Sequence, residues 1–263
     1  RARRCGNGDL SDHLQTCLRS GETMSITLWI PSADSSARWP CVNTWWNLET
    51  PNNEKMRLVR SGANNIKYSW NKVVSDFLKT DDEWLLSMHS DVTADPKTLM
   101  RLLSWDKPLV SALIFMRTSP AMPHIWKDYE DKEKHYVPRI KETRKWFYDH
   151  PECIKNFGPY VMEERPDDAL TLVSFTSTSC MLINRTVLEE MREIIGDVWF
   201  LLDDDYNGGG EDRRFCEVAL QAGYETFVDR SCVVGHLAGD IPTSAADFFA
   251  WDYVSTVLNT GEH

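Results

Sequence analysis

The sequence predicts a single α/β domain whose mostly parallel central sheet lies between two layers of helices. Short apolar runs typical of buried strands alternate along the chain with segments whose apolar residues recur at helical spacing. The 263 residues suit one large domain, or at most two small ones, and the 42% hydrophobic content supplies a sizeable core. Polar groups that can carry chemistry follow directly after predicted strands, which is where open α/β sheets bind ligands.

Four strands and two helices are predicted in the first half of the chain. One helix has an apolar face from Trp70 to Leu78, with apolar residues at positions i, i+3, i+4, i+7 and i+8. A second helix is expected to start at Asp95, as N-cap, with Pro96 in the first helical position. The four strands are apolar runs bounded by polar residues or proline, at 25–30, 56–59, 84–88 and 109–116.

The segment 117–168 has a different character. It is charged, aromatic and rich in proline, it shows little periodicity, and it is too long for an ordinary connection. We therefore expect either an insertion or a lid on the acceptor side of the functional site.

Regular structure is expected to resume after residue 168. One helix has an apolar face from Val187 to Ile195, and another opens at Glu211 and is capped by Gly223. The remaining strands are 170–175, 180–183, 225–229 and 231–234, and the last two lead to Gly235-His236.

The domain boundaries follow from these elements. Met24 stands directly before the first strand, so 1–23 is expected to be an N-terminal extension. One domain is then expected at 24–240, followed by a tail at 241–263 that ends in a helix.

Composition argues against several classes of protein. The net charge of −11 argues against a broad nucleic-acid-binding surface, because nonspecific affinity for phosphates comes largely from Lys and Arg. The seven cysteines are odd in number and scattered, without the spacing of zinc sites, which indicates a reducing, cytoplasmic protein. We expect no membrane span, because no apolar run approaches the roughly 18 residues that a span needs, and no signal peptide.

The first candidate motif is His89-Ser90-Asp91, directly after the strand predicted at 84–88. Hard cations such as Mg²⁺ or Mn²⁺ prefer oxygen ligands and commonly bridge one or two carboxylates to substrate phosphates. Asp91 at a strand end suits that chemistry, and His89 lies close enough in sequence to reach the same ion. Taken alone, the motif is better explained by Asp91 capping the next turn and His89 packing in a polar pocket.

The second candidate motif is Glu211-Asp212, which follows three glycines at 208–210 and opens a predicted helix. Either carboxylate is a candidate general base that removes a proton from an acceptor hydroxyl. Acidic residues in a first helical turn also favour the helix macrodipole, which is a purely structural explanation. A calcium loop is a weaker alternative: the run from Asp203 to Gly208 matches the opening of an EF-hand, but its twelfth position is Arg214 and not Glu.

The third candidate is His236, at the end of the run 231–234 and Gly235. A lone histidine at a strand end is usually an ordinary hydrogen-bonded residue, so its significance depends on the other two motifs. If all three converge on one edge of the sheet, they indicate a divalent metal that handles a phosphorylated substrate.

In order and spacing, these motifs resemble the nucleotide-sugar glycosyltransferases of the GT-A fold, in particular the family-2-like ones. Those enzymes often read A-R-N, then E-W-L-L, then D-x-D. The resemblance spans 25–239, and although each motif is modest, the ordered set is fairly specific. The matching segments are Ser69-Trp70-Asn71, Glu83-Trp84-Leu85-Leu86, His89-Ser90-Asp91, Asp95-Pro96 with Leu99, 179–185, 210–216 with Ala222-Gly223-Tyr224, and Val234-Gly235-His236.

Two positions depart from the family pattern. His89 replaces the first Asp of D-x-D, which puts a ribose or metal contact there in doubt. Trp70 replaces the Arg before Asn71, which removes a cation that could meet a diphosphate. Asp91, the position that the family uses to coordinate the metal, is retained.

The resemblance implies a GT-A (Rossmann-like) α/β/α sandwich that transfers a sugar from a UDP- or GDP-sugar donor to an acceptor hydroxyl, with inversion favoured and retention left open. It implies that Asp91 and His236 hold Mn²⁺ or Mg²⁺, with His89 as a further metal candidate. Asp212 is the preferred general base and Glu211 the second. The residues implied in donor binding lie near the ends of the first strands and in the following helix: Pro31, Ser32, Asp34, Arg60, Asn65, Asn71, His89 and Ser90.

The acceptor stays open between a glycan, a small molecule and a modified nucleic-acid base. A nucleic-acid acceptor is suggested only by a basic cluster of Lys141, Arg144 and Lys145. A catalytically silent GT-A-like binding module is the other alternative, because of His89. Aromatic residues are candidates for sugar stacking, although core packing is the more usual role. They are Trp126, Trp146, Phe147 and Trp199.

Overall fold

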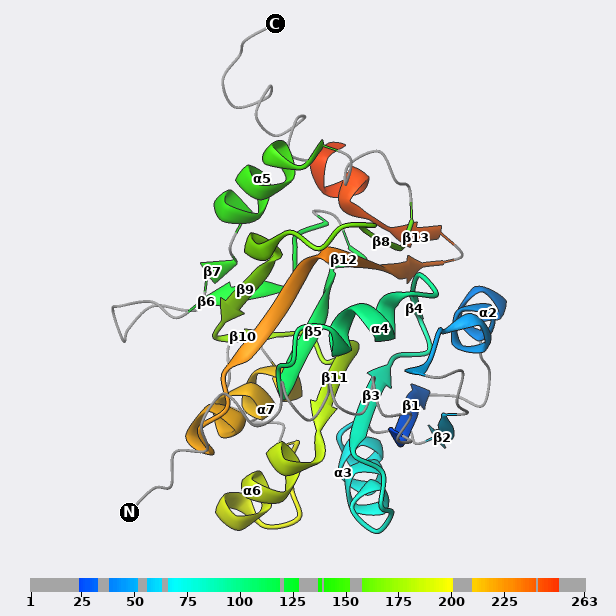
Figure 1. The fold of residues 1–263 in the computed structure, drawn as a ribbon, viewed down its shortest axis with the longest axis vertical. Coiled ribbons are helices and arrows are strands. Elements are labelled where there is room, and N and C mark those ends of the chain that lie inside the picture. Colours follow the sequence, from blue (N-terminus) through cyan, green and yellow to red (C-terminus); the bar gives the residue numbers. More distant parts are fainter. Residues whose placement is uncertain are drawn as a thin grey trace, which may run out of the picture.

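The computed structural model describes residues 24–32, 38–51, 56–62, 66–118, 121–127, 137–138, 140–151, 158–200, 210–239 and 241–250. In this part of the chain a ten-stranded sheet runs through the molecule with helices on both sides (Figure 1). Its main path has the order β13-β12-β5-β11-β3-β1-β2. The six central strands are β1 (Ile26–Ser32), β2 (Arg57–Gly62), β3 (Trp84–Met88), β5 (Leu109–Ile114), β11 (Cys180–Asn184) and β12 (Thr226–Ala238).

Five of the six central strands run in the same direction. β1 is parallel to β2 and to β3, and β12 is parallel to β5. β11 is antiparallel to both of its neighbours, β3 and β5. The predicted mostly parallel α/β sheet is therefore confirmed. Four short strands pair antiparallel with β12, namely β4 (Val92–Thr93), β8 (Tyr160–Val161), β9 (Leu170–Val173) and β13 (Ile241–Thr243).

The central strands contribute to two apolar cores, one on each face of the sheet. In β3, Leu86 belongs to the core that includes α4 (Thr98–Leu103), whereas its neighbour Leu85 belongs to the other. Strands that are buried on both faces consist of nearly continuous apolar residues, which is why the sequence predicts them well. The second core receives the apolar faces of α3 (Ile66–Phe77), α6 (Arg185–Ile195) and α7 (Gly210–Gln221).

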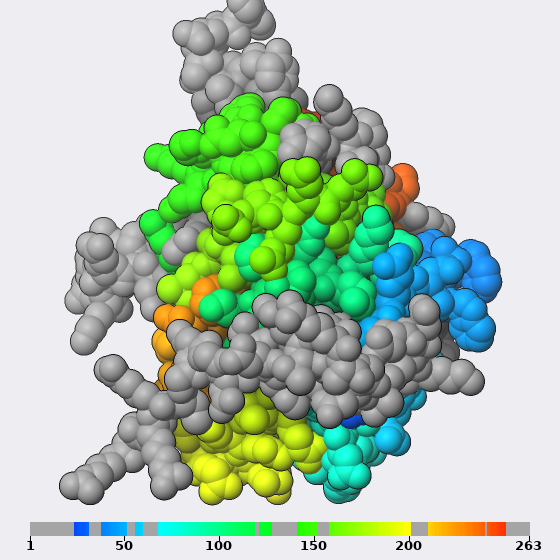
Figure 2. Space-filling view, viewed as in Figure 1, coloured from blue at the N-terminus to red at the C-terminus, as the bar shows by residue number. Residues whose placement is uncertain are grey.

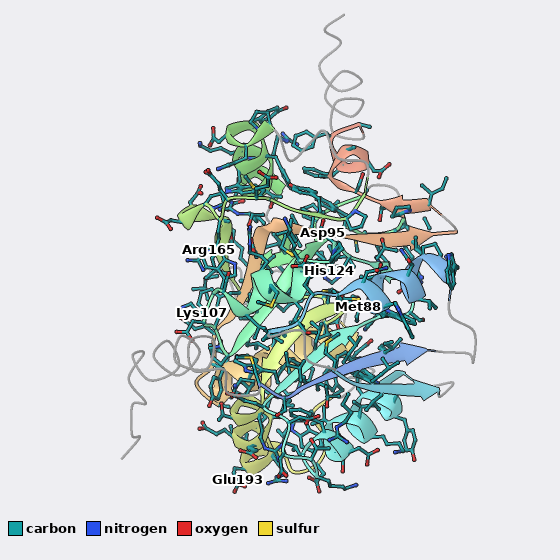
Figure 3. All side chains as sticks on the ribbon, turned by 45° about the vertical axis from the view of Figure 1, so that its right-hand side comes forward. Met88, Asp95, Lys107, His124, Arg165 and Glu193 are labelled. Carbon is teal, nitrogen blue, oxygen red and sulfur yellow. The ribbon has the colours of Figure 1, made fainter. Side chains whose placement is uncertain are left out.

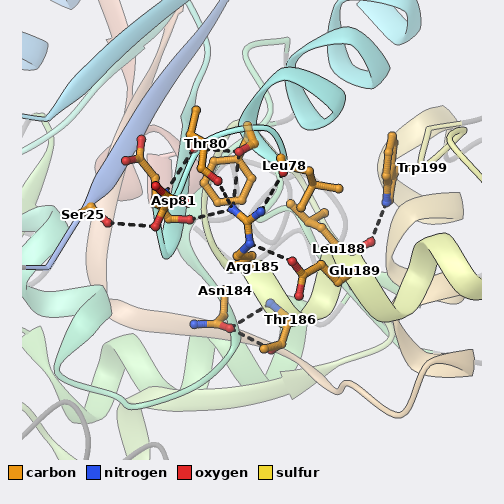
Figure 4. A network of polar contacts seen from close by, with 12 residues as sticks. Ser25, Leu78, Thr80, Asp81, Asn184, Arg185, Thr186, Leu188, Glu189 and Trp199 are labelled. Carbon is orange, nitrogen blue, oxygen red and sulfur yellow. Dashed lines mark hydrogen bonds and ion pairs between the residues drawn. The ribbon is translucent and has the colours of Figure 1, made fainter.

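Arg185, the first residue of α6, anchors the edge of the sheet where the parallel strands begin. Its guanidinium donates hydrogen bonds to the carbonyls of Leu78 at 2.7 Å and Thr80 at 2.9 Å, and it pairs with Glu189 at 2.7 Å (Figure 4). Carbonyls at the end of a helix lack partners within the helix, and a cation there satisfies them and favours the helix dipole. Arg185 thus fixes the end of α3 to the start of α6.

Helix α2 (Trp39–Asn47) was not predicted from the sequence. It packs beside β4, where the Thr44 hydroxyl accepts a hydrogen bond from the Ala94 amide at 3.2 Å. Its outer side leaves Trp39 and Trp46 exposed, and the helix forms the blue right-hand edge of the molecule in Figure 2. An apolar pattern that places tryptophans on the outside does not have the periodicity of a core-facing helix.

Three predicted boundaries are wrong. The helix expected from Asp95 begins at Thr98: the Asp95 carboxylate accepts from the Lys97 amide at 2.9 Å, so Asp95 closes a turn just before the helix. The strand expected at 170–175 divides at Ser174 into β9 and β10 (Phe175–Thr176), and β10 belongs to a second, three-stranded sheet. The strands expected at 225–229 and 231–234 are one strand, β12, whose pairing with β5 shifts register between Asp229 and Val233.

The segment 117–168 contains more regular structure than its sequence suggests. In its described part, β6 (Ile125–Lys127) and β7 (Val137–Pro138) pair with each other, and α5 (Ile140–Asp149) follows. Trp146 and Phe147 of α5 lie in a third apolar cluster together with Phe248. Core packing is therefore confirmed for these two aromatics, and also for the buried Trp199.

Among the helices in the described ranges, none combines the length and the apolar character needed to cross a bilayer.

Candidate functional site

Three segments that are far apart in the sequence meet where β1 and β3 end. The Ser90 amide donates to the Pro31 carbonyl at 3.2 Å, which joins the ends of β3 and β1. The Leu237 amide donates to the Asp91 carbonyl at 2.8 Å, and His236 pairs with Val92 in the ladder between β12 and β4. β12 therefore runs directly past the predicted motif, at the edge of the sheet where open α/β folds bind ligands.

Asp91 and His236 lie side by side at this edge. The His236 Nε2 is 3.4 Å from the Asp91 Oδ2, and the His236 Nδ1 is 3.1 Å from the Phe115 carbonyl. Because a carbonyl only accepts, Nδ1 carries a hydrogen, and Nε2 is the nitrogen left to bind a proton or a metal. His236 lies within β12 and not after its end as predicted.

Gly235 makes the close approach of β12 to its neighbours possible. A Cβ at this position would lie 2.6 Å from the Pro242 Cβ and 2.6 Å from the Thr93 Oγ1. No real side chain tolerates such contacts, so glycine is required for β4 and β13 to pack on either side of the residue before His236.

Arg117, which is not among the predicted site residues, also contacts Asp91. Its Nη1 lies 2.8 Å from the Asp91 Oδ2. Burial raises the pKa of Asp91, but His236, His89 and Arg117 outweigh burial and lower the pKa to about 2. Asp91 is therefore ionised at physiological pH. Arg117 stands just beyond the strand predicted at 109–116, and this position at the same edge was the signal that could have identified it.

His89 is neutral and partly buried. Burial lowers its pKa to about 4, with smaller opposing and reinforcing effects from Asp91 and His236. Its Nδ1 is 3.3 Å from the Ser179 hydroxyl, while its Nε2 is buried without a hydrogen-bond partner. Within the described residues no three His, Cys, Asp or Glu side chains are arranged to hold a metal. Of the three predicted metal residues, the structure places only Asp91 and His236 in contact.

His124 is a second residue of this region that the sequence did not reveal. Burial, and to a lesser degree His236, lowers its pKa to about 4, and its Nδ1 has no hydrogen-bond partner. The His124 amide donates to the Ile114 carbonyl at 2.8 Å, which places His124 beside the end of β5. It belongs to the segment without periodicity, so nothing in the sequence placed it here.

Asp212 lies in the first turn of α7, in contact with the segment that precedes β11. The Thr178 amide donates to the Asp212 Oδ1 at 3.2 Å, and the Thr178 hydroxyl donates to the same atom. Burial raises the pKa of Asp212, although the Thr178 and Ser177 hydrogen bonds and the nearby His236 oppose the rise. Burial and the Asp212 charge also raise the pKa of Glu211. Both candidate bases thus hold protons more tightly than ordinary carboxylates.

Buried hydroxyls connect the two acidic regions. The Ser177 hydroxyl, which bonds Asp212, lies 2.6 Å from the Ser179 hydroxyl, and Ser179 contacts His89. His89 is therefore linked to Asp212, the predicted base, through the hydroxyls of Ser179 and Ser177. It does not join Asp91 and His236 as a third candidate metal ligand.

Asn71 is tied to the backbone of a neighbouring segment. Its Nδ2 donates to the Phe200 carbonyl and its Oδ1 accepts from the Phe200 amide, both at 2.9 Å. The adjacent Trp70 is buried against Trp29 and Phe200, with ring centroids 3.7 Å and 4.1 Å apart. The position that holds a cation in the family pattern is thus an aromatic core residue here.

The other predicted donor-binding residues lie along the same edge where they are described. Pro31 and Ser32 end β1, and Arg60 in β2 pairs with Ile30. Ser90 lies in the turn after β3. Asp34 and Asn65 fall outside the described residues. The role of each of these residues in donor binding stays a prediction.

Comparison with known proteins yields similarity in structure but not in sequence. No protein-family model matches the chain, and no curated protein matches it. The structure of A197 from STIV superimposes with a TM-score of 0.50 and 14% identity, over 84% of this chain and 91% of that one. GalNAc-T7, solved with UDP, GalNAc and Mn²⁺, gives a TM-score of 0.52 and 10% identity over 89% of this chain.

The chain covers 48% of the GalNAc-T7 chain, about half of its length. S. aureus TarS 1–349 gives a TM-score of 0.41 at 12% identity, over 91% of this chain and 67% of that one, and adds nothing to the fold assignment. Together with the sheet order, the two stronger similarities confirm the predicted architecture: the chain has the GT-A fold of glycosyltransferases.

Proposed function

We propose that the chain is a metal-dependent glycosyltransferase that moves a sugar from a nucleotide-diphosphate donor to an acceptor hydroxyl. The observation that carries this proposal is the contact of Asp91 with His236 at 3.4 Å, at the edge of the sheet where β1 and β3 end. An ionised carboxylate and an imidazole nitrogen oriented by a backbone carbonyl suit a cation that also binds substrate phosphates.

The donor is proposed to be a UDP-sugar, with a GDP-sugar as the alternative. The support is the GT-A fold shared with GalNAc-T7, which was solved with UDP, GalNAc and Mn²⁺. Nucleotide binding would involve the ends of β1 and β2, where Pro31, Ser32 and Arg60 lie, and the turn at Ser90.

Asp91 and His236 would hold Mn²⁺ or Mg²⁺. The fit is a partial protein site: two protein ligands, with the remaining positions left to phosphate and water oxygens. The Phe115 carbonyl fixes the His236 ring, because metal-binding histidines commonly donate their other ring N–H to a carbonyl or carboxylate. When bound, such a cation would stabilise the negative charge that develops on the departing nucleotide.

Asp212 is proposed to remove the proton from the acceptor hydroxyl, with Glu211 as the second candidate. Its raised pKa makes it a stronger base than an ordinary aspartate, and the two hydrogen bonds from Thr178 to Oδ1 orient the carboxylate. A base on the face opposite the departing nucleotide would give a single displacement with inversion.

The test is a panel of UDP- and GDP-sugars incubated with the protein and Mn²⁺. We expect slow hydrolysis of at least one donor, measured as released nucleotide, and its loss in Asp91→Asn. If no donor binds or is hydrolysed, the proposed function is wrong.

A catalytically silent GT-A-like binding module is the second candidate function. It is favoured by the neutral His89, whose buried Nε2 has no partner at a position where the family carries a carboxylate. Such a module would bind a nucleotide sugar and return it unchanged after prolonged incubation, whereas the proposed enzyme would not.

A nucleic-acid acceptor has less support. Of the basic cluster on α5, Lys145 pairs with Asp149 at 2.6 Å, which offsets part of its charge. DNA binding that weakens with salt would favour this acceptor, and no binding at low salt would exclude it.

A cytoplasmic location is also proposed. Its support is that the four cysteines in the described ranges, Cys41, Cys180, Cys216 and Cys232, are free and buried. Buried reduced cysteines behave as small hydrophobic residues and are typical of reducing compartments.

A further inference from the structure

We propose that Arg117 is a donor-binding residue that pairs with Asp91 until the donor arrives and then moves to the donor's diphosphate. The inference rests on the proposed function, because it assumes a metal and a nucleotide diphosphate at Asp91. It assigns to Arg117 the positive charge that the family pattern places in the helix before Asn71.

The first argument is that Arg117 stands where a metal would bind. One oxygen of Asp91, Oδ2, is 2.8 Å from the Arg117 Nη1 and 3.4 Å from the His236 Nε2. A cation held between Asp91 and His236 would therefore lie against the guanidinium and be repelled by it. Binding of the metal requires Arg117 to give up this contact.

The second argument is that Arg117 is able to move. Its side chain is 56% exposed, and ion pairs of exposed groups are weak because water screens them. The backbone before it is fixed, since the Met116 amide donates to the Met122 carbonyl at 2.8 Å. The side chain can therefore change partners while its point of attachment stays in place.

The third argument is that a diphosphate at this edge needs a fixed positive charge. Trp70, at the position of the family's cation, is buried in the aromatic core. A second described arginine, Arg38, also lies in this region, since both it and Asp91 affect the pKa of the Cys41 thiol, but its guanidinium donates to the Gly239 carbonyl. A guanidinium is permanently charged and binds phosphate oxygens through two parallel hydrogen bonds. Arg117 supplies that group within reach of the metal candidates.

The first test measures binding of Mn²⁺ alone by electron paramagnetic resonance of the free ion. We expect Arg117→Gln to bind Mn²⁺ about fivefold more tightly than the unmodified chain, because a competing cation has been removed. The matched control is Arg192→Gln, which removes the same charge from an exposed position on α6. Figure 3 shows its neighbour Glu193 at the far end of the molecule from Met88 and His124.

The second test measures UDP binding by calorimetry at saturating Mn²⁺. We expect Arg117→Gln to weaken UDP binding about tenfold, since a charge-assisted contact to phosphate is lost. Arg117→Lys should recover part of the loss, and Arg192→Gln should have no effect. Opposite effects on metal and nucleotide are the signature of the proposed exchange, because a merely structural role would weaken both.

The outcomes separate this inference from the proposed function. If Mn²⁺ and UDP bind and both are lost in Asp91→Asn, but Arg117→Gln changes neither, Arg117 has no such role while the proposed function stands. If neither the unmodified chain nor Arg117→Gln binds Mn²⁺ or UDP, both proposals are wrong.

Discussion

Two carboxylates at the functional edge have opposite electrostatic environments. Asp91 contacts the Arg117 guanidinium and the His236 ring, and its pKa falls to about 2. Asp212 is partly buried and accepts hydrogen bonds from hydroxyls and an amide, and burial raises its pKa. When the environments of two acids separate their pKa values, the two acids suit different roles. Asp91 stays ionised and suits a ligand of a metal cation, whereas Asp212 suits a base that gains and loses a proton.

Asp91→Asn should have the largest effect if this division of roles is right. Removing the charge leaves His236 as the single protein ligand, so Mn²⁺-dependent donor hydrolysis is expected to fall to the background rate. Released nucleotide and Mn²⁺ binding measure the effect. Unchanged Mn²⁺ binding in this variant would contradict the metal role of Asp91.

Asp212→Asn should lower kcat by about a hundredfold to ten-thousandfold, because it removes a general base. The asparagine carbonyl can still accept the Thr178 hydrogen bonds, so Mn²⁺ and UDP binding are expected to stay the same. The pH profile gives a second check. The pKa of Asp212 is raised in the folded protein. As the pH is lowered, kcat should therefore start to fall at a higher pH than it would with an ordinary aspartate as base.

Glu211→Gln is the matched control for Asp212→Asn, one residue away in the same helical turn. It should lower kcat less. If Glu211→Gln instead lowers kcat more than Asp212→Asn does, Glu211 is the base and the hydrogen bonds to Asp212 stabilise the fold.

Gly235→Ala tests whether the position of His236 depends on the packing of β12. The new Cβ would lie 2.6 Å from Pro242, a rigid neighbour, so we expect a loss of about 1–3 kcal/mol in the free energy of unfolding. Mn²⁺ affinity should fall as well, because His236 is the next residue. Gly158→Ala is the control, since a Cβ there meets nothing within 4 Å. Equal effects of the two substitutions, measured by denaturant unfolding, would contradict this account.

Asp82, like Asp91, is a carboxylate paired with an arginine, but it lies away from the candidate functional site. It accepts from Arg57 at 2.8 Å and from the Thr27 hydroxyl, just before β3 begins. Burial raises its pKa, but these partners outweigh burial and lower the pKa. Asp82→Asn should cost about 1 kcal/mol of stability, because water screens the exposed Arg57, and should leave Mn²⁺ binding unchanged.

The pH dependence of stability is a second test of the ion pair at Asp82. The folded pKa of Asp82 is lower than the ordinary 3.8, so the unfolded chain binds the proton more tightly. Its contribution is fully present above the ordinary pKa and is lost as the pH falls through the folded pKa. Asp82→Asn should flatten this acidic part of the stability curve, measured by denaturant unfolding at several pH values.

The fold could be predicted wherever a local pattern reports burial. The run Trp84–Met88 is apolar because both faces of β3 are covered, and the helical spacing from Trp70 onward reflects one buried face of α3. The register shift in β12 has no comparable signal. Asp229 was predicted to end a strand, yet its carboxylate is completely buried and accepts a hydrogen bond from the Trp105 Nε1 at 2.7 Å. Partners distant in sequence decide such features.

The sequence by itself determined the central strands, the mostly parallel sheet and the polar residues at its edge, because burial and strand ends leave local patterns. Only the tertiary structure decided which of those residues meet. It joined Asp91 to His236 through the pairing of β12 with β4, brought Arg117 against the same carboxylate and placed the His89 Nδ1 against the Ser179 hydroxyl. The physical reason is that contacts across strands depend on register and bulges, which the spacing of residues along one strand does not encode.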